Sequence, residues 1–163
     1  MHLQAAAGWF ELGNHLEANA ELDKIAPTFR KHTDVLEFRW KMWAKEKKWM
    51  MCEEIARAII RADPYLPSGW LYQAETLKSQ GKLKEAYSKL YVVFNDFPDS
   101  WRVPYNLARY SSLLGEYKEA AKWFERAFAI DRETVRINGS DHPDLKPMWD
   151  NFHTLLEDKD VTD

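Results

Sequence analysis

The sequence predicts an all-α fold in which pairs of antiparallel helices stack into a solenoid. Two observations lead to this prediction: Gly and Pro are scarce, at 6 and 7 of 163 residues, and similar side chains recur every 34 residues. Gly and Pro disfavour helix interiors more than other residues do, so their scarcity allows most of the chain to be helical. A fixed interval of 34 residues is typical of stacked helical hairpins.

The 34-residue register is seen in several independent columns of the sequence. Gly81 and Gly115 are 34 residues apart, and two further steps back along the chain reach Lys47 and Gly13. The other columns hold small residues (Ala18, Cys52, Ala86 and Ala120), large residues (His15, Trp49, Leu83 and Tyr117) or apolar residues (Leu22, Ala56, Leu90 and Phe124). Because these columns agree without insertion or deletion, each recurring residue is expected to lie at an equivalent place in successive units.

Each unit contains two runs of helical periodicity that are separated by a break. In 101–134, apolar residues precede the break at Gly115, and further apolar residues follow it at Ala120, Phe124, Ala127 and Phe128. The spacing i, i+4, i+7 and i+8 predicts one face of a helix. Gly115 suits the left-handed turn that ends the preceding helix. One hairpin cannot bury both of its apolar faces, so successive hairpins are expected to stack.

The register divides most of the chain into four units, which are expected to form one domain. The first unit spans 1–32 and is short, because Pro27 ends its second helix early. The remaining units span 33–66, 67–100 and 101–134.

The segment after residue 134 departs from the period. Two dipeptides in it favour turns, Asn138-Gly139 and His142-Pro143, so 135–146 is expected to be a linker. A last helix is predicted over 147–157, and 158–163 is expected to be a flexible tail. The predicted helix carries an apolar stripe that would cover the exposed face of the final repeat, formed by Met148, Trp149, Phe152, Leu155 and Leu156.

The later units resemble the tetratricopeptide repeat. The signature positions are occupied in 101–134 by Leu107, Ala108, Gly115, Tyr117, Ala120, Phe124 and Ala127, and in 67–100 by Trp70, Ala74, Gly81, Ala86, Leu90 and Pro98. The unit 33–66 departs from the pattern, with Lys47 in the turn and Trp40 where a small residue is usual. The resemblance covers residues 1–134 and implies a right-handed α-solenoid of about four helix-turn-helix units with a C-terminal capping helix.

Composition and motifs disfavour several classes of function. The net charge is −3 with acids and bases mixed, whereas nucleic-acid binding needs a concentrated basic surface, so no nucleic-acid partner is expected. The five His residues and the single Cys52 have no metal-ligand spacing, and no catalytic motif is present, so we expect no enzyme, metal or cofactor. No apolar run approaches the roughly 20 residues of a membrane span, and no signal peptide is evident, so a cytoplasmic location is expected.

The resemblance implies that a partner binds on the concave side, which the first helix of each unit lines. Transferred position by position, this lining consists of Phe38, Lys41, Lys45, Leu71, Tyr72, Glu75, Lys78, Arg102, Tyr105, Asn106 and Arg109. Basic residues outnumber acidic ones, so the expected ligand is a peptide or helix with acidic groups beside apolar anchors. For each single charge, an ordinary solvated helix face is the alternative.

Three roles follow from this interpretation. The leading hypothesis is a protein-interaction scaffold or adaptor that binds a peptide or helix of its partner. One alternative is a small chaperone of the same family for a secreted or assembling client. Another is a self-associating module, since the aromatic surplus and the irregular first unit could leave an apolar patch. RNA binding by helical repeats is disfavoured by the acidic net charge.

Overall fold

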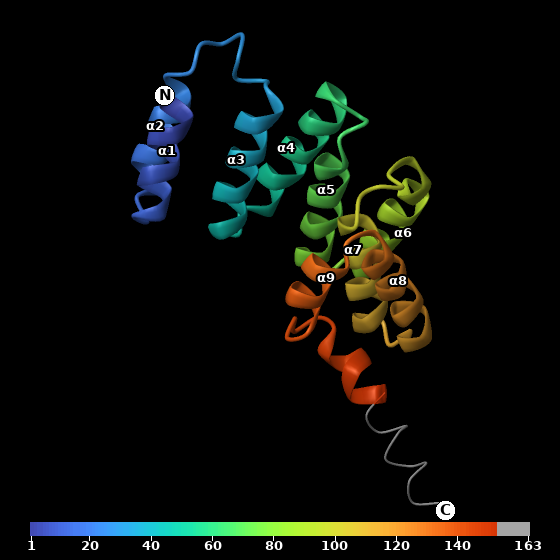
Figure 1. Ribbon diagram of the computed structural model, residues 1–163. Helices are drawn as coiled ribbons and strands as arrows, with labels where there is room; N and C mark the ends of the chain where they lie inside the picture. The colour runs from blue at the N-terminus through green and yellow to red at the C-terminus, as the bar shows by residue number, and fades with distance from the viewer. Residues whose placement is uncertain (153–163) are drawn as a thin grey trace, which may run out of the picture. The chain divides into compact units, whose positions relative to one another are not determined.

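A computed structural model of the chain describes residues 1–152 and contains helices but no strand over that range (Figure 1). The all-α prediction is therefore confirmed. The helices are α1 (His2–Glu11), α2 (His15–Asp23), α3 (Thr33–Lys45), α4 (Trp49–Ala62), α5 (Pro67–Ser79), α6 (Leu83–Val92), the short 3-10 helix η1 (Phe94–Asp96), α7 (Arg102–Leu113), α8 (Tyr117–Ile130) and α9 (Arg132–Gly139), followed by a helical segment over 146–152.

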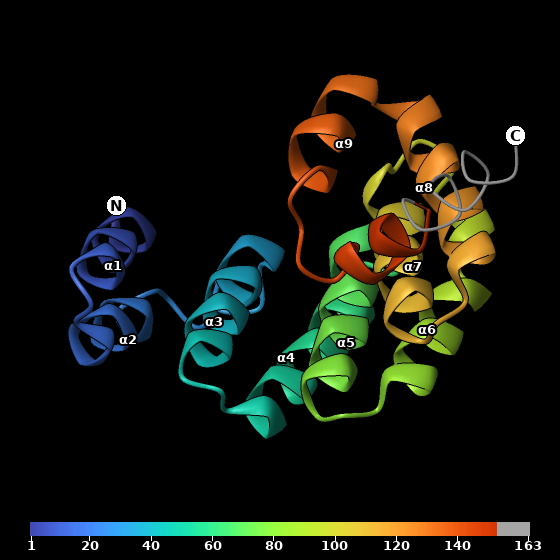
Figure 2. The same ribbon diagram turned by 90° about the horizontal axis from the view of Figure 1, so that it is seen from below.

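The chain divides into two compact units, Met1–Gly81 and Lys82–Asp163. Unit 1 contains α1 to α5, and unit 2 contains α6 to α9 and the helical segment over 146–152. Within unit 1, α3 lies between the α1–α2 hairpin and α4 (Figure 2). The boundary between the units falls in the turn between α5 and α6, inside the predicted 67–100 repeat.

A residue in the left-handed region follows the first helix of every hairpin. The φ angle is 78° at Gly13, 57° at Lys47, 79° at Gly81 and 81° at Gly115. The backbone N–H of Gly81 donates to the carbonyl of Lys78 (2.9 Å), and that of Gly115 donates to the carbonyl of Ser112 (3.1 Å). Such a turn satisfies carbonyls that the end of a helix would otherwise leave unpaired. Gly81 and Gly115 therefore lie at equivalent corners of successive hairpins, as the register predicts.

The small-residue column lies in the interior of the helix packing. Ala18, Cys52, Ala86 and Ala120 are all fully buried. Because protein interiors are packed to near-crystalline density, a larger side chain at these positions would force the paired helices apart. The fully buried Leu22, Leu90 and Ala127 follow from the apolar spacing in the same way.

The first hairpin is joined to α3 by an apolar cluster and by an arginine. The cluster consists of Ala6, Ala18, Leu22, Val35 and Met42. Arg39 donates to the carboxylate of Asp23 (2.7 Å) and to the side-chain oxygen of Asn19 (3.2 Å). Helix α2 ends at Asp23, four residues before Pro27, in agreement with the expected short second helix.

The expectation that 135–146 is a linker is wrong over its first part, because α9 occupies Arg132–Gly139. The side chain of Asp131 caps this helix by accepting from the N–H of Thr134 (3.1 Å). Gly139 is needed for a close approach rather than for a turn. A Cβ atom there would lie 2.5 Å from the ring of Phe124, which real contacts do not allow.

A helical segment is described over 146–152, which overlaps the first part of the helix expected over 147–157. Residues 153–157 and the expected tail over 158–163 lie outside the described residues. Leu145 and Met148 are fully buried, so this part of the chain belongs to the core of unit 2. None of the helices described over 1–152 combines the length and the apolar character that crossing a membrane requires.

Candidate partner-binding surface

In unit 1, two of the helices that were predicted to line the groove form one continuous wall. The ring of Trp40 on α3 stacks on that of Tyr72 on α5, with centroids 4.3 Å apart and planes at 17°. The Trp40 indole N–H donates to the hydroxyl of Thr76 (3.0 Å), and the Ser68 hydroxyl donates to the carboxylate of Glu37 (2.5 Å). The large Trp40, which departs from the family pattern, therefore joins α3 to α5.

The α3 residues of the predicted lining differ in what they contact. Phe38 is half-buried and meets the ring of Phe10 on α1 edge-on, at 5.6 Å between centroids. The Lys45 ammonium lies 4.7 Å from the centroid of the same Phe10 ring, a cation–π contact that holds this long side chain in place. Lys41 is exposed on α3. The cationic edge of this wall is therefore built from Lys41 and Lys45.

The α5 residues of the predicted lining are all partly accessible. Leu71, Tyr72, Glu75 and Lys78 are intermediate in exposure. The Lys78 ammonium lies 3.5 Å from the Glu75 carboxylate, one helical turn away. A pair of this kind, with both side chains about a quarter exposed, contributes little to stability. The wall thus presents apolar, aromatic and charged groups side by side.

In unit 2, the predicted face of α7 is covered by the chain's own C-terminal segment. Tyr105 is 5% exposed, and its hydroxyl donates to the carbonyl of Asn138 (2.8 Å). Burial raises the pKa of Tyr105 above its usual value, so the hydroxyl remains a donor. The hydroxyl of Ser112 accepts from the N–H of Met148 (3.2 Å). Tyr105 is therefore in contact with α9 instead of presenting its ring to a partner.

Arg109 makes the strongest of these contacts. Its Nε and Nη2 atoms both donate to Asp144 Oδ2, at 3.0 and 2.6 Å, and the two side chains are only 12% and 15% exposed. Two further predicted residues lie on α7. Asn106 donates to the carbonyl of Arg102 (2.8 Å) and accepts from Arg109. The guanidinium carbon of Arg102 lies 5.6 Å from the ring centroid of Trp101. Two of the four predicted α7 residues, Tyr105 and Arg109, thus hold the chain's own segment.

The spacing of these contacts explains why the segment docks there. The pairs Tyr105–Asn138, Arg109–Asp144 and Ser112–Met148 are separated by 33, 35 and 36 residues, close to one repeat. The segment after α8 therefore packs on α7 much as the first helix of a following unit would. Sequence reasoning missed this contact because the segment lacks the repeated columns, although the near-34 spacing of Arg109 and Asp144 could have indicated it.

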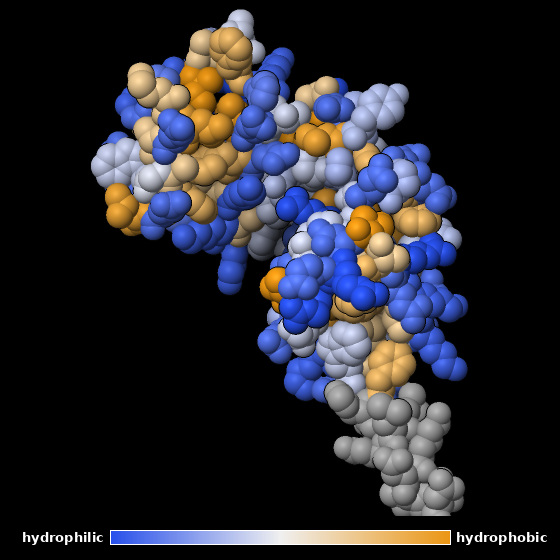
Figure 3. All heavy atoms as spheres, in the orientation of Figure 1, coloured by the Kyte–Doolittle hydropathy of each residue, from blue (hydrophilic) through white to orange (hydrophobic). Residues whose placement is uncertain are grey.

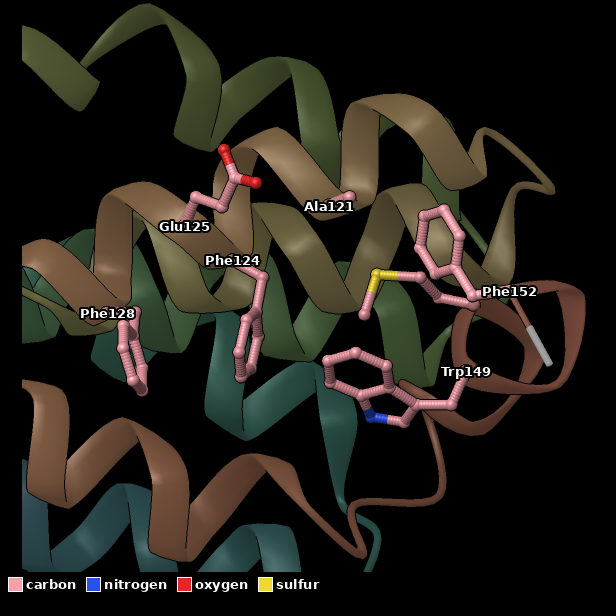
Figure 4. A pocket seen from close by; sticks show the side chains of 7 residues that line it. Ala121, Phe124, Glu125, Phe128, Trp149 and Phe152 are labelled. Carbon is pink, nitrogen blue, oxygen red and sulfur yellow. The ribbon is translucent and has the colours of Figure 1, made fainter. Parts of the chain in front are cut away.

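An apolar pocket opens between α8 and the helical segment over 146–152 (Figure 4). Its volume is about 350 Å³, and Trp149 meets Phe124 edge-on with centroids 5.1 Å apart. In Figure 4 the carboxylate of Glu125 points away from the Phe124 and Phe128 rings, so the walls are almost entirely apolar. The lining consists of Ala121, Phe124, Glu125, Phe128, Met148, Trp149 and Phe152.

The described residues do not assemble a metal site. No three His, Cys, Asp or Glu side chains within residues 1–152 lie close enough together to hold a metal ion. Cys52 is fully buried with its Sγ 3.8 Å from the carbonyl of Trp40, and desolvation raises its pKa to about 11. The thiol is therefore protonated at neutral pH and acts as a packing group.

Several solved structures share this fold. Pseudomonas aeruginosa pilF has a TM-score of 0.68 at 19% identity, over 94% of this chain and 74% of that one. MamA, residues 41 to the end, from Desulfovibrio magneticus RS-1 has a TM-score of 0.65 at 15% identity, over 80% and 74%. A double mutant of MamA RS-1 has a TM-score of 0.64 at 16% identity, over 86% and 76%. MamA and pilF are both tetratricopeptide-repeat proteins. No protein-family model and no curated protein sequence matches the chain.

Proposed function

Because the chain has the fold of tetratricopeptide-repeat proteins, we propose that it is a protein-interaction scaffold that binds a peptide or helix of a partner protein. The observation that carries the proposal is the wall of α3 and α5, which the Trp40–Tyr72 stack and the bond between Ser68 and Glu37 hold together. A wall fixed before binding loses little conformational entropy when a ligand docks, which favours affinity.

The ligand class is supported by the charges and rings on this wall. Lys41 and Lys45 can pair with carboxylates, while Phe38, Leu71 and Tyr72 offer contact area to apolar side chains. We therefore propose a ligand with acidic groups beside apolar anchors, bound through the unit 1 residues of the predicted lining.

Unit 2 supplies an example of such a ligand within the chain itself. On α7, Arg109 binds the carboxylate of Asp144, and the next residue, Leu145, is fully buried. An acidic residue beside an apolar anchor is the pattern proposed for the partner. The predicted residues Arg102, Tyr105, Asn106 and Arg109 thus belong to a face whose chemistry suits this class of segment.

Affinity purification from native lysate followed by mass spectrometry tests the proposal. The informative variant is Lys41→Glu with Lys45→Glu, which reverses charge at exposed positions; Lys84→Glu with Lys89→Glu on α6 is the matched control. We expect a partner that is recovered with the wild type and the control but lost with the α3 variant. Equal recovery with both variants, at unchanged melting temperatures, would remove the α3 surface from the proposal. Recovery of a single secreted client would favour the chaperone alternative.

Self-association is a second candidate, favoured by an apolar patch at the start of unit 1. Hydrophobic side chains gather near the beginning of α1 and the α2–α3 connection (Figure 3). Phe29 is 63% exposed there and borders a pocket of about 450 Å³ with Leu3, Ile25 and Val35. Light scattering over a dilution series tests this candidate, with Phe29→Ser as the disrupting variant and Tyr65→Ser, 87% exposed, as the control. A monomer at every concentration would eliminate it.

A further inference from the structure

Near the end of α8, the guanidinium of an arginine lies over two aromatic rings. The guanidinium of Arg126 lies 4.7 Å from the ring centroid of Trp123 and 5.2 Å from that of Phe94. Trp123 is itself fixed, since its indole N–H donates to the hydroxyl of Tyr87 (3.2 Å) and it is only 3% exposed. Phe94 meets Trp123 edge-on at 4.9 Å. The rings therefore form a rigid platform under the guanidinium.

Arg126 has no carboxylate partner among the described residues. Two other arginines of unit 2 are paired, Arg109 with Asp144 and Arg136 with Glu133, whereas no ion pair or side-chain hydrogen bond is formed by Arg126 within residues 1–152. Stacking uses the face of the planar guanidinium and leaves its N–H edge able to donate. The N–H groups of Arg126 therefore remain available to an acceptor that the described part of the chain does not supply.

This guanidinium borders an apolar pocket that lies entirely within unit 2. The pocket has a volume of about 450 Å³, and no carboxylate is among the described residues that line it. Phe97 and Pro104 are buried in its wall, while Ile130 is 40% exposed at its edge. The full lining is Phe94, Asn95, Phe97, Pro98, Pro104, Arg126, Ala129 and Ile130.

We propose that this pocket is a second partner-binding site, which takes an apolar side chain of a partner protein while Arg126 pairs with a neighbouring carboxylate of the same segment. The charge of Arg126 is complementary to a carboxylate, and guanidinium–carboxylate pairing is directional and can be bidentate. Aromatic residues and arginine beside a pocket are typical of the residues that dominate binding energy at interfaces. The site is separate from the α3–α5 wall and does not depend on it.

The surroundings favour a single carboxylate over a run of negative charges. Two carboxylates lie near the pocket: Asp96 is exposed at the end of η1, and Asp99 is exposed on the connection to α7 that also supplies Phe97 and Pro98 to the pocket. A polyanion such as RNA would bring several phosphates near these carboxylates and be repelled. A peptide with one acidic residue next to a large apolar residue brings a single negative charge to Arg126 and is repelled much less.

The proposal is tested by NMR titration of the ¹⁵N-labelled full chain with two capped tetrapeptides. One contains a single Glu next to Phe, and in the other Gln replaces the Glu. We expect the Trp123 indole N–H and the Arg126 Nε–H signals to shift with the Glu peptide, and the Gln peptide to bind about tenfold more weakly or worse. Arg126→Gln should remove the difference between the peptides. Lys122→Gln, one turn earlier on α8 and exposed, should retain it.

Three results would overturn the proposal. One is an unshifted Trp123 signal at millimolar peptide, and another is equal affinity of Arg126→Gln and the wild type. The third is a comparable shift with inorganic phosphate or a short RNA oligonucleotide, which would mean a general anion site. Should Arg126→Gln fail to fold by circular dichroism, Ile130→Glu at the exposed edge of the pocket should abolish binding instead. The double variant Lys41→Glu with Lys45→Glu should leave this titration unchanged. A negative result for the α3 surface can therefore be told apart from a negative result for the pocket beside Arg126.

Discussion

The first helices of the repeats use the same position differently in the two units. In unit 1, α3 and α5 contact one another through Trp40 and Tyr72 and present Lys41 and Lys45 at the surface. In unit 2, the corresponding face of α7 holds the chain's own segment through Tyr105 and Arg109. A position that is accessible on a helix face in one repeat is thus a packing position in another. The neighbour that covers it decides between these roles.

The comparison predicts its largest effect for the buried part of the segment that docks on α7. Leu145→Ala deletes a fully buried side chain, and the cavity left behind should lower the free energy of unfolding by about 2–5 kcal/mol. Leu71→Ala on α5 removes the same atoms from a half-buried position and should cost on the order of 1 kcal/mol. Urea unfolding followed by tryptophan fluorescence measures both. Equal losses would mean that the two faces are equally buried.

A smaller effect is expected from the ion pair on the same face. Asp144→Ala leaves the mostly buried Arg109 without the carboxylate that accepts two of its hydrogen bonds, which should cost about 2–3 kcal/mol. Glu133→Ala breaks the pair with Arg136, whose side chains are both largely exposed, and should leave stability almost unchanged because solvent screens the pair. Thermal melts at low and high salt measure both variants. A loss with Glu133→Ala as large as with Asp144→Ala would show that burial does not set the difference.

Much of the fold could be predicted from the sequence, because helices and turns depend on nearby residues and the repeat recurs at a fixed interval. Gly81 and Gly115 marked equivalent turns, and the buried Ala86 and Ala120 followed from the same interval. Gly139 was misinterpreted because a glycine can serve a turn or a close approach, and only the position of the Phe124 ring distinguishes the two. The sequence shows where a glycine lacks a side chain, but it does not show which neighbouring group lies in the space.

The candidate surface was less predictable, because whether a residue is covered depends on segments that are distant in the sequence. Lys41 and Tyr105 were assigned to the lining by the same rule, yet Lys41 is exposed and Tyr105 is buried under α9. The rule assumes that nothing follows the last repeat on its inner face. The pocket beside Arg126 was missed for a related reason, since it combines residues from the α6–α7 connection with residues of α8.

The turns offer the finest comparison, between successive hairpins, because one corner differs from the others in its side chain. Lys47 adopts a φ of 57° where Gly13, Gly81 and Gly115 adopt 78° to 81°. A residue with a Cβ atom is disfavoured there by roughly 1–2 kcal/mol, although glycine also loses more entropy on folding. Lys47→Gly should therefore raise the free energy of unfolding by about 0.5–1 kcal/mol, and Gly115→Ala should lower it by about 1 kcal/mol.

Thermal and urea unfolding measure the free energy of unfolding of both variants. The two changes are expected to have opposite signs, because one variant removes a Cβ atom from a left-handed residue and the other adds one. Lys47 is exposed, and a Cβ atom at Gly115 would meet no atom within 4 Å, so neither variant changes packing. The measured differences therefore isolate the conformational cost of the left-handed residue. A Lys47→Gly variant less stable than the wild type would mean that the corner after α3 is not strained. The turn would then tolerate a side chain for a reason other than the shared geometry of the repeats.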